Sequence, residues 1–416
     1  MDRSDGMAAS PDLDLGRPQS QARLWFEPLL IVLIMFASLY FNRDSSFSVF
    51  HSRNRHDDTA SLIKSNGDYF EDSRTSSRST SPDPPTQKDS LDVPRSISPL
   101  PWTEYPTKMN FPSRILQKFP FLVEMFYWAL NYVAYAMTKK AGGALYSRYG
   151  GDQVTQLAQE NGINILTLEH DTPLRLFFPV TEVAFQQFFL KGHLGVLSFF
   201  NQIYSLVHIP GTVAFLSWWY FRAPSHDVFA LVRRTMTLGN FSSFFIFSLY
   251  PCMPPRLLPE SFGFRDTVRQ DHAESVWAGG NNVNQLAAMP SLHFTYAFII
   301  GCTFLYQSGA LQACRGSRGV TRKNPVMSFG YIVAGVVYPL LVLSVIVATA
   351  NHYWLDAVVA TFSVALSLLC NRVWLALIPL ERLFCRILRL RKPTPTTARS
   401  RSREEPPRPR IVIDLA

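Results

Sequence analysis

The chain of 416 residues is 47% hydrophobic and 13% aromatic and carries a formal net charge of +9. Its polar residues are concentrated in the first quarter and the last tail, which is typical of a membrane protein with polar ends, and its basic residues lie in short loops beside apolar segments, which favours membrane topology over nucleic-acid binding. The five cysteines have no paired or metal-ligand spacing, so neither a disulfide framework nor a zinc site is indicated.

The first half of the chain alternates polar and apolar segments. Residues 1–23 are polar and are expected to be disordered, whereas residues 24–41 predict a transmembrane anchor, because no small-residue cleavage motif follows them. Residues 42–113, rich in Ser, Asp, Arg and Pro, predict a disordered linker. Residues 121–138 predict a second span, and residues 153–191 an amphipathic, interfacial helix. The number of spans here, and the side of the membrane on which the linker lies, stay open.

The second half predicts five consecutive spans, each of about 20 residues or slightly more: residues 195–220, 228–250, 287–306, 326–350 and 353–378. We therefore expect an all-α polytopic membrane protein with a membrane-embedded catalytic domain over residues 114–380. Residues 381–416 predict a basic, disordered cytoplasmic tail. Arginines and lysines gather in alternate loops and after the last span, which assigns those regions to the cytoplasm. The loop over residues 251–286 and the turn at Asn351 should face a lumen or the cell exterior.

Three motifs lie at span ends on that non-cytoplasmic side. Residues 250–256, YPCMPPR, close one span; residues 288–293, AMPSLH, open the next; and residues 351–356, NHYWLD, open the last. In the third motif His352 and Asp356 are four residues apart, which puts both side chains on one face of a helix. An ionisable pair within membrane-type sequence is expensive to bury, so this pair predicts a functional site.

The residue types in these motifs indicate phosphoryl transfer. His352 can attack phosphorus through one ring nitrogen while Asp356 accepts a hydrogen bond from the other nitrogen and fixes the tautomer. His293 can protonate the leaving alkoxide and later act as base toward the acceptor. This set requires neither a metal nor another cofactor. Alone, His352 and Asp356 could equally form a structural hydrogen-bonded pair; the three motifs together favour catalysis.

Two groups are candidates to bind the phosphate. Arg256 offers a planar fork to non-bridging phosphate oxygens. Pro290 suits the first turn of a helix, which would leave the amides near Ser291 and Leu292 as donors beside the positive end of the helix dipole. Alone, an arginine at an interface more often extends its charge to water, so this assignment depends on the other motifs.

Two further sets of side chains have a structural interpretation beside the functional one. Tyr204 and His208 could line the same cavity, but packing or a helix–helix hydrogen bond is favoured. Glu169, His170 and Asp171 superficially resemble a metal-ligand cluster. Neighbours in sequence point in different directions on a helix, so a solvated surface is favoured for these three residues.

Over about residues 155–378, the three motifs resemble the type 2 phosphatidic acid phosphatase superfamily, specifically the branch that contains the fungal inositol phosphorylceramide synthase. The resemblance implies a six-helix membrane core in which His293, His352 and Asp356 form a metal-independent triad facing the lumen of the Golgi or another endomembrane. It also implies lipid substrates: the synthase moves phosphoinositol from phosphatidylinositol to ceramide and leaves diacylglycerol, whereas the wider superfamily hydrolyses lipid phosphates.

The chain departs from the family at two places. The general pattern has an arginine six residues before the nucleophilic histidine, and Ile346 stands there. Residues 307–324 add a long basic loop. A lipid phosphate phosphatase of the same superfamily, a non-catalytic lipid-binding protein and a transporter are the alternatives. The donor head group, the acceptor, the organelle and the oligomeric state stay open.

Overall fold

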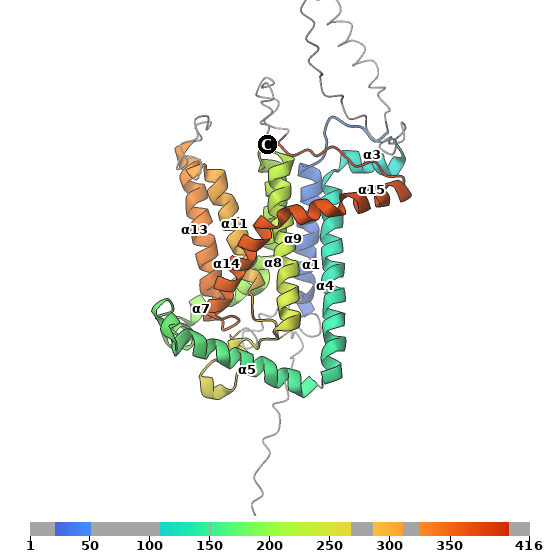
Figure 1. Ribbon diagram of the computed structural model, residues 1–416. Helices are drawn as coiled ribbons and strands as arrows, with labels where there is room; N and C mark the ends of the chain where they lie inside the picture. The colour runs from blue at the N-terminus through green and yellow to red at the C-terminus, as the bar shows by residue number, and fades with distance from the viewer. Residues whose placement is uncertain (1–20, 51–108, 150, 268–285, 311–323, 399–416) are drawn as a thin grey trace, which may run out of the picture.

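A computed structural model describes residues 21–50, 109–149, 151–267, 286–310 and 324–398. This part of the chain is helical and has no strand, apart from one isolated bridge between Cys252 and Ala287. The long helices run side by side as a bundle (Figure 1): α1 (Gln21–Phe41), α4 (Phe121–Tyr149), α8 (His208–Arg222), α9 (His226–Leu249), α11 (Leu292–Ser308), α13 (Pro325–Ala348) and α14 (Trp354–Leu369).

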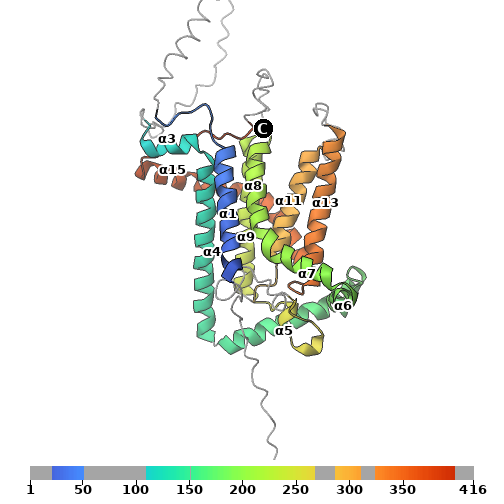
Figure 2. The same cartoon turned by 180° about the vertical axis from the view of Figure 1, so that it is seen from behind.

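Five other helices lie at the two ends of this bundle. They are α3 (Phe111–Lys118), α5 (Gly151–His170), α6 (Glu182–Gly192), α7 (Leu194–Gln202) and α15 (Ile378–Ile387). Figure 2 shows α5 lying across one end of the bundle and α3 near the other. The amphipathic helix expected within residues 153–191 is thus two helices, α5 and α6, which lie at one end of the bundle.

By length and composition, α13 is the one described helix that could cross a membrane by itself. A second candidate is α14 together with the helical residues 371–387, which are bent by 50° relative to it. The predicted spans are therefore confirmed as helices, while the number of membrane crossings stays a prediction.

Some predicted boundaries were wrong. The segment 195–220 is α7 and α8 joined by a π-helix (Ile203–Val207), and the last helix stops at Leu369, well before residue 378. Just beyond that stop, the Asn371 side chain donates to the Leu231 carbonyl oxygen of α9 at 3.0 Å. This contact holds the chain where it changes direction.

Close packing of α11 against α13 depends on two glycines. A Cβ atom added to Gly301 would lie 2.4 Å from Cγ of Pro339 and 2.7 Å from the carbonyl oxygen of Gly335. Such small residues let helix backbones approach closely. Beside this contact, a buried apolar cluster joins α11, α13 and α14: Phe294, Ala297, Val342, Ile346, Val347, Ala357 and Ala360.

The residues after α1 and after α15 meet at the end of the bundle opposite α5. The Asp44 amide donates to the Lys118 carbonyl oxygen at 2.8 Å, and the Thr396 hydroxyl donates to the Asn42 carbonyl oxygen at 2.8 Å. The tail expected to be disordered over residues 381–416 instead continues α15 and then packs on this end as far as Ala398. The disorder predictions for residues 1–23 and 42–113 were also wrong where the structure describes them, because α1 begins at Gln21, α3 begins at Phe111 and residues 42–50 pack on this end. The rest of these segments, and residues 399–416, lie outside the described residues.

Candidate functional site

Backbone hydrogen bonds bring the three motifs together, as predicted from their shared end of the bundle. Cys252 receives a bond from the Ala288 amide at 3.1 Å and donates to the Leu286 carbonyl oxygen at 2.8 Å. The Arg256 amide donates to the Ala350 carbonyl oxygen at 2.9 Å. The first motif therefore lies between the second and the third and contacts both.

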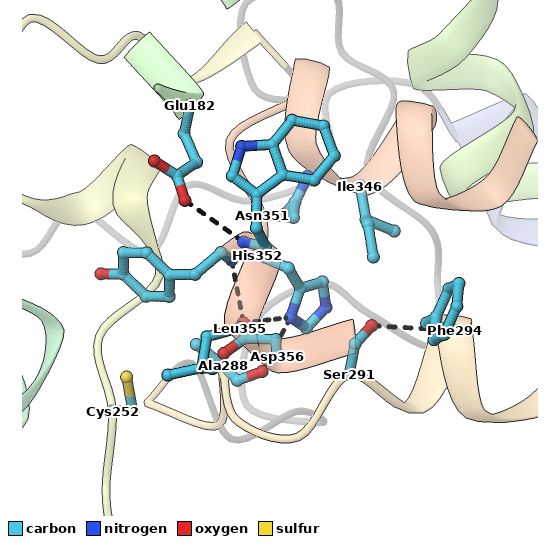
Figure 3. Close-up of polar contacts among 12 residues, drawn as sticks. Glu182, Cys252, Ala288, Ser291, Phe294, Ile346, Asn351, His352, Leu355 and Asp356 are labelled. Atoms are coloured by element: carbon cyan, nitrogen blue, oxygen red, sulfur yellow. Dashed lines mark hydrogen bonds and ion pairs between the residues drawn. The ribbon is translucent and has the colours of Figure 1, made fainter. Parts of the chain in front are cut away.

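His352 is held by its Nδ1 atom (Figure 3). This nitrogen lies 2.7 Å from the Ala288 carbonyl oxygen and 3.1 Å from Oδ2 of Asp356, and the residue is only 5% exposed. A carbonyl oxygen and an ionised carboxylate both accept hydrogen bonds and cannot donate them. Nδ1 must therefore carry the proton, which leaves Nε2 of the neutral imidazole with a free lone pair.

Asp356 is fully buried and also caps its own helix. Its Oδ2 atom accepts from the Tyr353 amide at 3.0 Å, while its Oδ1 atom is buried without a hydrogen-bond partner. The Tyr353 hydroxyl in turn donates to the Met253 carbonyl oxygen at 2.7 Å. The positive end of α14 and the first motif thus fix the carboxylate against His352.

His293 lies on the first turn of α11, and its ring centroid is 5.9 Å from that of His352. Tyr204 stacks on His293 with centroids 4.2 Å apart, and His208 lies 4.2 Å from it as well. Sequence analysis favoured a packing role for Tyr204 and His208, but both side chains contact the predicted proton donor. The π-helix Ile203–Val207 at this point is a local distortion common at functional sites, and no feature of its residues predicted it.

A small pocket opens beside His293, and its walls are mostly apolar. Ile346, at the position where the family pattern has arginine, is fully buried in this wall. The pocket is lined by Ile203, Tyr204, His208, His293, Tyr338, Val342, Val345 and Ile346. An apolar side chain, and not an arginine, therefore lines the pocket beside His293 at this position.

The predicted phosphate-binding groups have partners within the protein. Helix α11 begins at Leu292 with Ser291 as its N-cap, so the expectation that Pro290 occupies the first turn was wrong. The Ser291 hydroxyl accepts from the Phe294 amide at 3.3 Å. One guanidinium nitrogen of Arg256 lies 2.8 Å from Oδ2 of Asp266, which orients the fork. That Arg256 and Ser291 bind phosphate stays a prediction.

The interpretation of Glu169 as solvated surface was wrong, because this side chain is fully buried, as is Glu182. Glu169 accepts from the Leu355 amide at 2.5 Å, and Glu182 accepts from the Trp354 amide at 3.2 Å. Figure 3 shows Glu182 reaching the first turn of α14. Burial, together with the neighbouring Glu182 carboxylate, raises the pKa of the Glu169 carboxyl to about 10. The sequence places Glu169 beside His170 and Asp171, so it did not predict that the second carboxylate is that of Glu182 on α6.

In a comparison with protein families, residues 170–314 match the family model of the PAP2 superfamily. The matched segment includes His293 and ends before His352 and Asp356. No curated protein and no solved structure matches the chain. The match supports the superfamily and, with it, phosphatase or phosphotransferase activity on phosphate esters; it carries no information on the synthase branch.

Proposed function

We propose that this chain is a multi-pass membrane enzyme that transfers a phosphorylated head group between lipids through a covalent intermediate on His352. The observation that carries the proposal is the position of Nδ1 between two acceptors, which leaves Nε2 unprotonated beside His293. A nucleophile oriented by a third group, with an acid within reach, is the arrangement that covalent catalysis needs.

In the first half-reaction, Nε2 of His352 attacks the phosphorus of the donor lipid. The bond between phosphorus and the diacylglycerol oxygen breaks, and His293 gives its proton to that oxygen. The imidazole gains positive charge as the P–N bond forms. The buried Asp356 carboxylate stabilises that charge through the Nδ1–H group.

In the second half-reaction, His293 takes the proton from the acceptor hydroxyl. The acceptor oxygen attacks phosphorus, the P–N bond breaks, and His352 returns to its neutral form with the proton still on Nδ1. If the acceptor is a lipid hydroxyl the enzyme is a transferase, and if it is water the enzyme is a phosphatase.

The apolar wall beside His293 favours the lipid acceptor. Isoleucine and valine side chains exclude water from the neighbourhood of the intermediate and match a lipid chain. Phosphatidylinositol as donor and a ceramide-like lipid as acceptor follow from the motif resemblance, with the site on the lumenal side of the Golgi or another endomembrane. Hydrolysis of lipid phosphate is the second candidate, because the PAP2 superfamily match covers it equally well.

The proposal is tested by supplying the purified full-length protein with labelled phosphatidylinositol, with and without ceramide, and separating all labelled products. We expect a phosphoinositol-containing sphingolipid only when ceramide is present. Release of a water-soluble phosphate ester regardless of ceramide would establish the phosphatase instead. If no donor lipid is consumed under either condition, the chain is a non-catalytic relative.

A further inference from the structure

A second group of chemically active side chains lies where α5 ends and α6 begins. Nε2 of His170 is 2.8 Å from Oε2 of Glu182 and 3.8 Å from Oε2 of Glu169. The three atoms that could act as ligands lie within 4.8 Å of one another. The mechanism proposed above uses none of these three side chains.

Without a bound cation, the charges of this group balance within the protein only while Glu169 keeps a proton. Both carboxylates are fully buried, and in the described part of the chain their one ion-pair partner is His170. Each uses one oxygen to accept a backbone amide of α14, and the second oxygen of Glu169 is buried with no hydrogen-bond partner. A divalent cation can take the place of that proton, with the partnerless oxygen of Glu169 as one of its ligands.

We infer that Glu169, His170 and Glu182 bind one divalent transition-metal ion of the zinc class. One imidazole nitrogen and two carboxylate oxygens suit Zn²⁺ or Mn²⁺, whereas Mg²⁺ and Ca²⁺ prefer oxygen ligands alone. Ligand atoms around a tetrahedral zinc ion lie about 3.4 Å apart, between the two spacings from His170 to the carboxylates. Small side-chain adjustments would therefore complete the site.

The ion would have a structural role. The two carboxylates hold the first turn of α14 through the amides of Trp354 and Leu355, next to His352 and Asp356. Fixing both carboxylates with one cation would join α5, α6 and α14 at that point. The proposed transfer assigns no step to this ion.

The test is the metal content of the full-length protein, purified with an affinity tag that contains no histidine and without chelators, measured by inductively coupled plasma mass spectrometry. We expect about one zinc-class ion per chain in the wild type. Glu169→Gln, which keeps an oxygen for the Leu355 amide, and His170→Ala should both lose the ion. Asp171→Asn, which changes an exposed carboxylate on the neighbouring residue, is the matched control and should retain it.

A second readout does not depend on the ion surviving purification. Chelator-treated wild type and Asp171→Asn should gain several degrees in Tm when Zn²⁺ is added, and His170→Ala should gain none. A metal-free wild type whose Tm does not respond to Zn²⁺ or Mn²⁺ would overturn the inference and leave a shared proton as the balancing charge. Equal metal content in His170→Ala would overturn it too, because the ion would then be bound elsewhere.

Discussion

The hydrogen bonds of a single imidazole nitrogen determine what the site can do. With Nδ1 of His352 shared between the Ala288 carbonyl and the Asp356 carboxylate, the tautomer is set before any substrate arrives. A nucleophile whose lone pair is already available needs no proton transfer in the first step. This explains why the Asp356 carboxylate is kept fully buried despite its desolvation penalty.

Replacing Asp356 tests this view. In Asp356→Asn, an amide N–H directed at Nδ1 would favour the tautomer with the proton on Nε2, so turnover should fall by about 10²–10⁴-fold, as it does in other histidine–aspartate pairs. His352→Ala should abolish turnover altogether. The control is His193→Ala, which alters an exposed histidine at the start of α7. Activity of Asp356→Asn equal to wild type, at equal amounts of folded protein, would remove the aspartate from the mechanism.

Arg256 is the candidate for substrate binding. Charge-assisted hydrogen bonds contribute about 1.5–3 kcal/mol each, so Arg256→Gln should lower kcat/KM by roughly 10–100-fold. The exposed Arg265 nearby supplies the matched control, Arg265→Gln. Initial rates over a range of donor concentrations in mixed micelles would give both constants. An identical kcat/KM for the two variants would assign Arg256 to pairing with Asp266 alone.

For single residues, the spacing within a short segment predicted a contact, whereas contacts between distant segments could not be predicted from the sequence. The interval of four residues predicted the contact of His352 with Asp356, but the expectation that both lie on one helix was wrong, because α14 begins at Trp354 and His352 precedes its N-cap. Nothing near Glu169 in the sequence reveals that Glu182, from the next helix, lies beside it, or that both accept amides of α14. Likewise, His208, which contacts His293, directly follows the π-helix Ile203–Val207, whose residues carry no sequence signal for that distortion.

Among the elements, α11 and α13 hold the site at their adjoining ends. His293 lies in the first turn of α11, and the chain leaves α13 to reach His352 within a few residues. The amides of Asn351 and His352 both donate to the Ile346 carbonyl oxygen, at 3.0 and 3.2 Å, so the turn is anchored to the last part of α13. A shift between these two helices would therefore separate the two histidines.

Gly301→Ala tests that packing. The added methyl group would overlap Pro339 and the Gly335 backbone, and overpacking of this kind destabilises proteins by about 1–3 kcal/mol. We expect a lower Tm and reduced activity. Gly330→Ala is the control, since its Cβ would meet no atom within 4 Å. If thermal melts of the two variants coincide, α11 and α13 are not as closely packed as described.

The presence of the helices was predictable, because apolar segments of span length indicate helices. The residues at which the helices end were not predictable. The last helix ends early because the chain bends at Cys370 and Asn371 binds α9, a contact between distant segments. The helical tail α15 was missed because its composition is basic, and sequence alone assigned that composition to disorder.

In the whole molecule, the three candidate catalytic motifs and the basic loops lie at opposite ends of the bundle. The three motifs and α5 lie at one end, while the residues after α1 and the segment after α15 lie at the other (Figures 1 and 2). Residues 42–50 share an end of the bundle with the chain after α15. The assignment of that end to the cytoplasm by the positive-inside rule stays a prediction.

Cysteine labelling tests this orientation in sealed microsomes, with the native cysteines replaced. Ser225→Cys, in the short loop between α8 and α9, should react with a membrane-impermeant maleimide in intact vesicles. Leu176→Cys, on the exposed segment after α5, should react only after detergent is added. Labelling of both positions in intact vesicles would mean that the two ends of the bundle do not lie on opposite sides of a membrane.

The most direct measurement of the mechanism is detection of the covalent intermediate. Without the ceramide acceptor the second half-reaction should stop after His352 has been modified, so the wild type should be mixed with phosphatidylinositol alone, quenched under alkaline conditions and digested for peptide mass spectrometry. We predict a phosphoinositol group on the imidazole of His352, absent from Asp356→Asn and His352→Ala treated in the same way. Label on another residue, or turnover of wild type by a route that leaves His352 unmodified in every variant, would contradict the account.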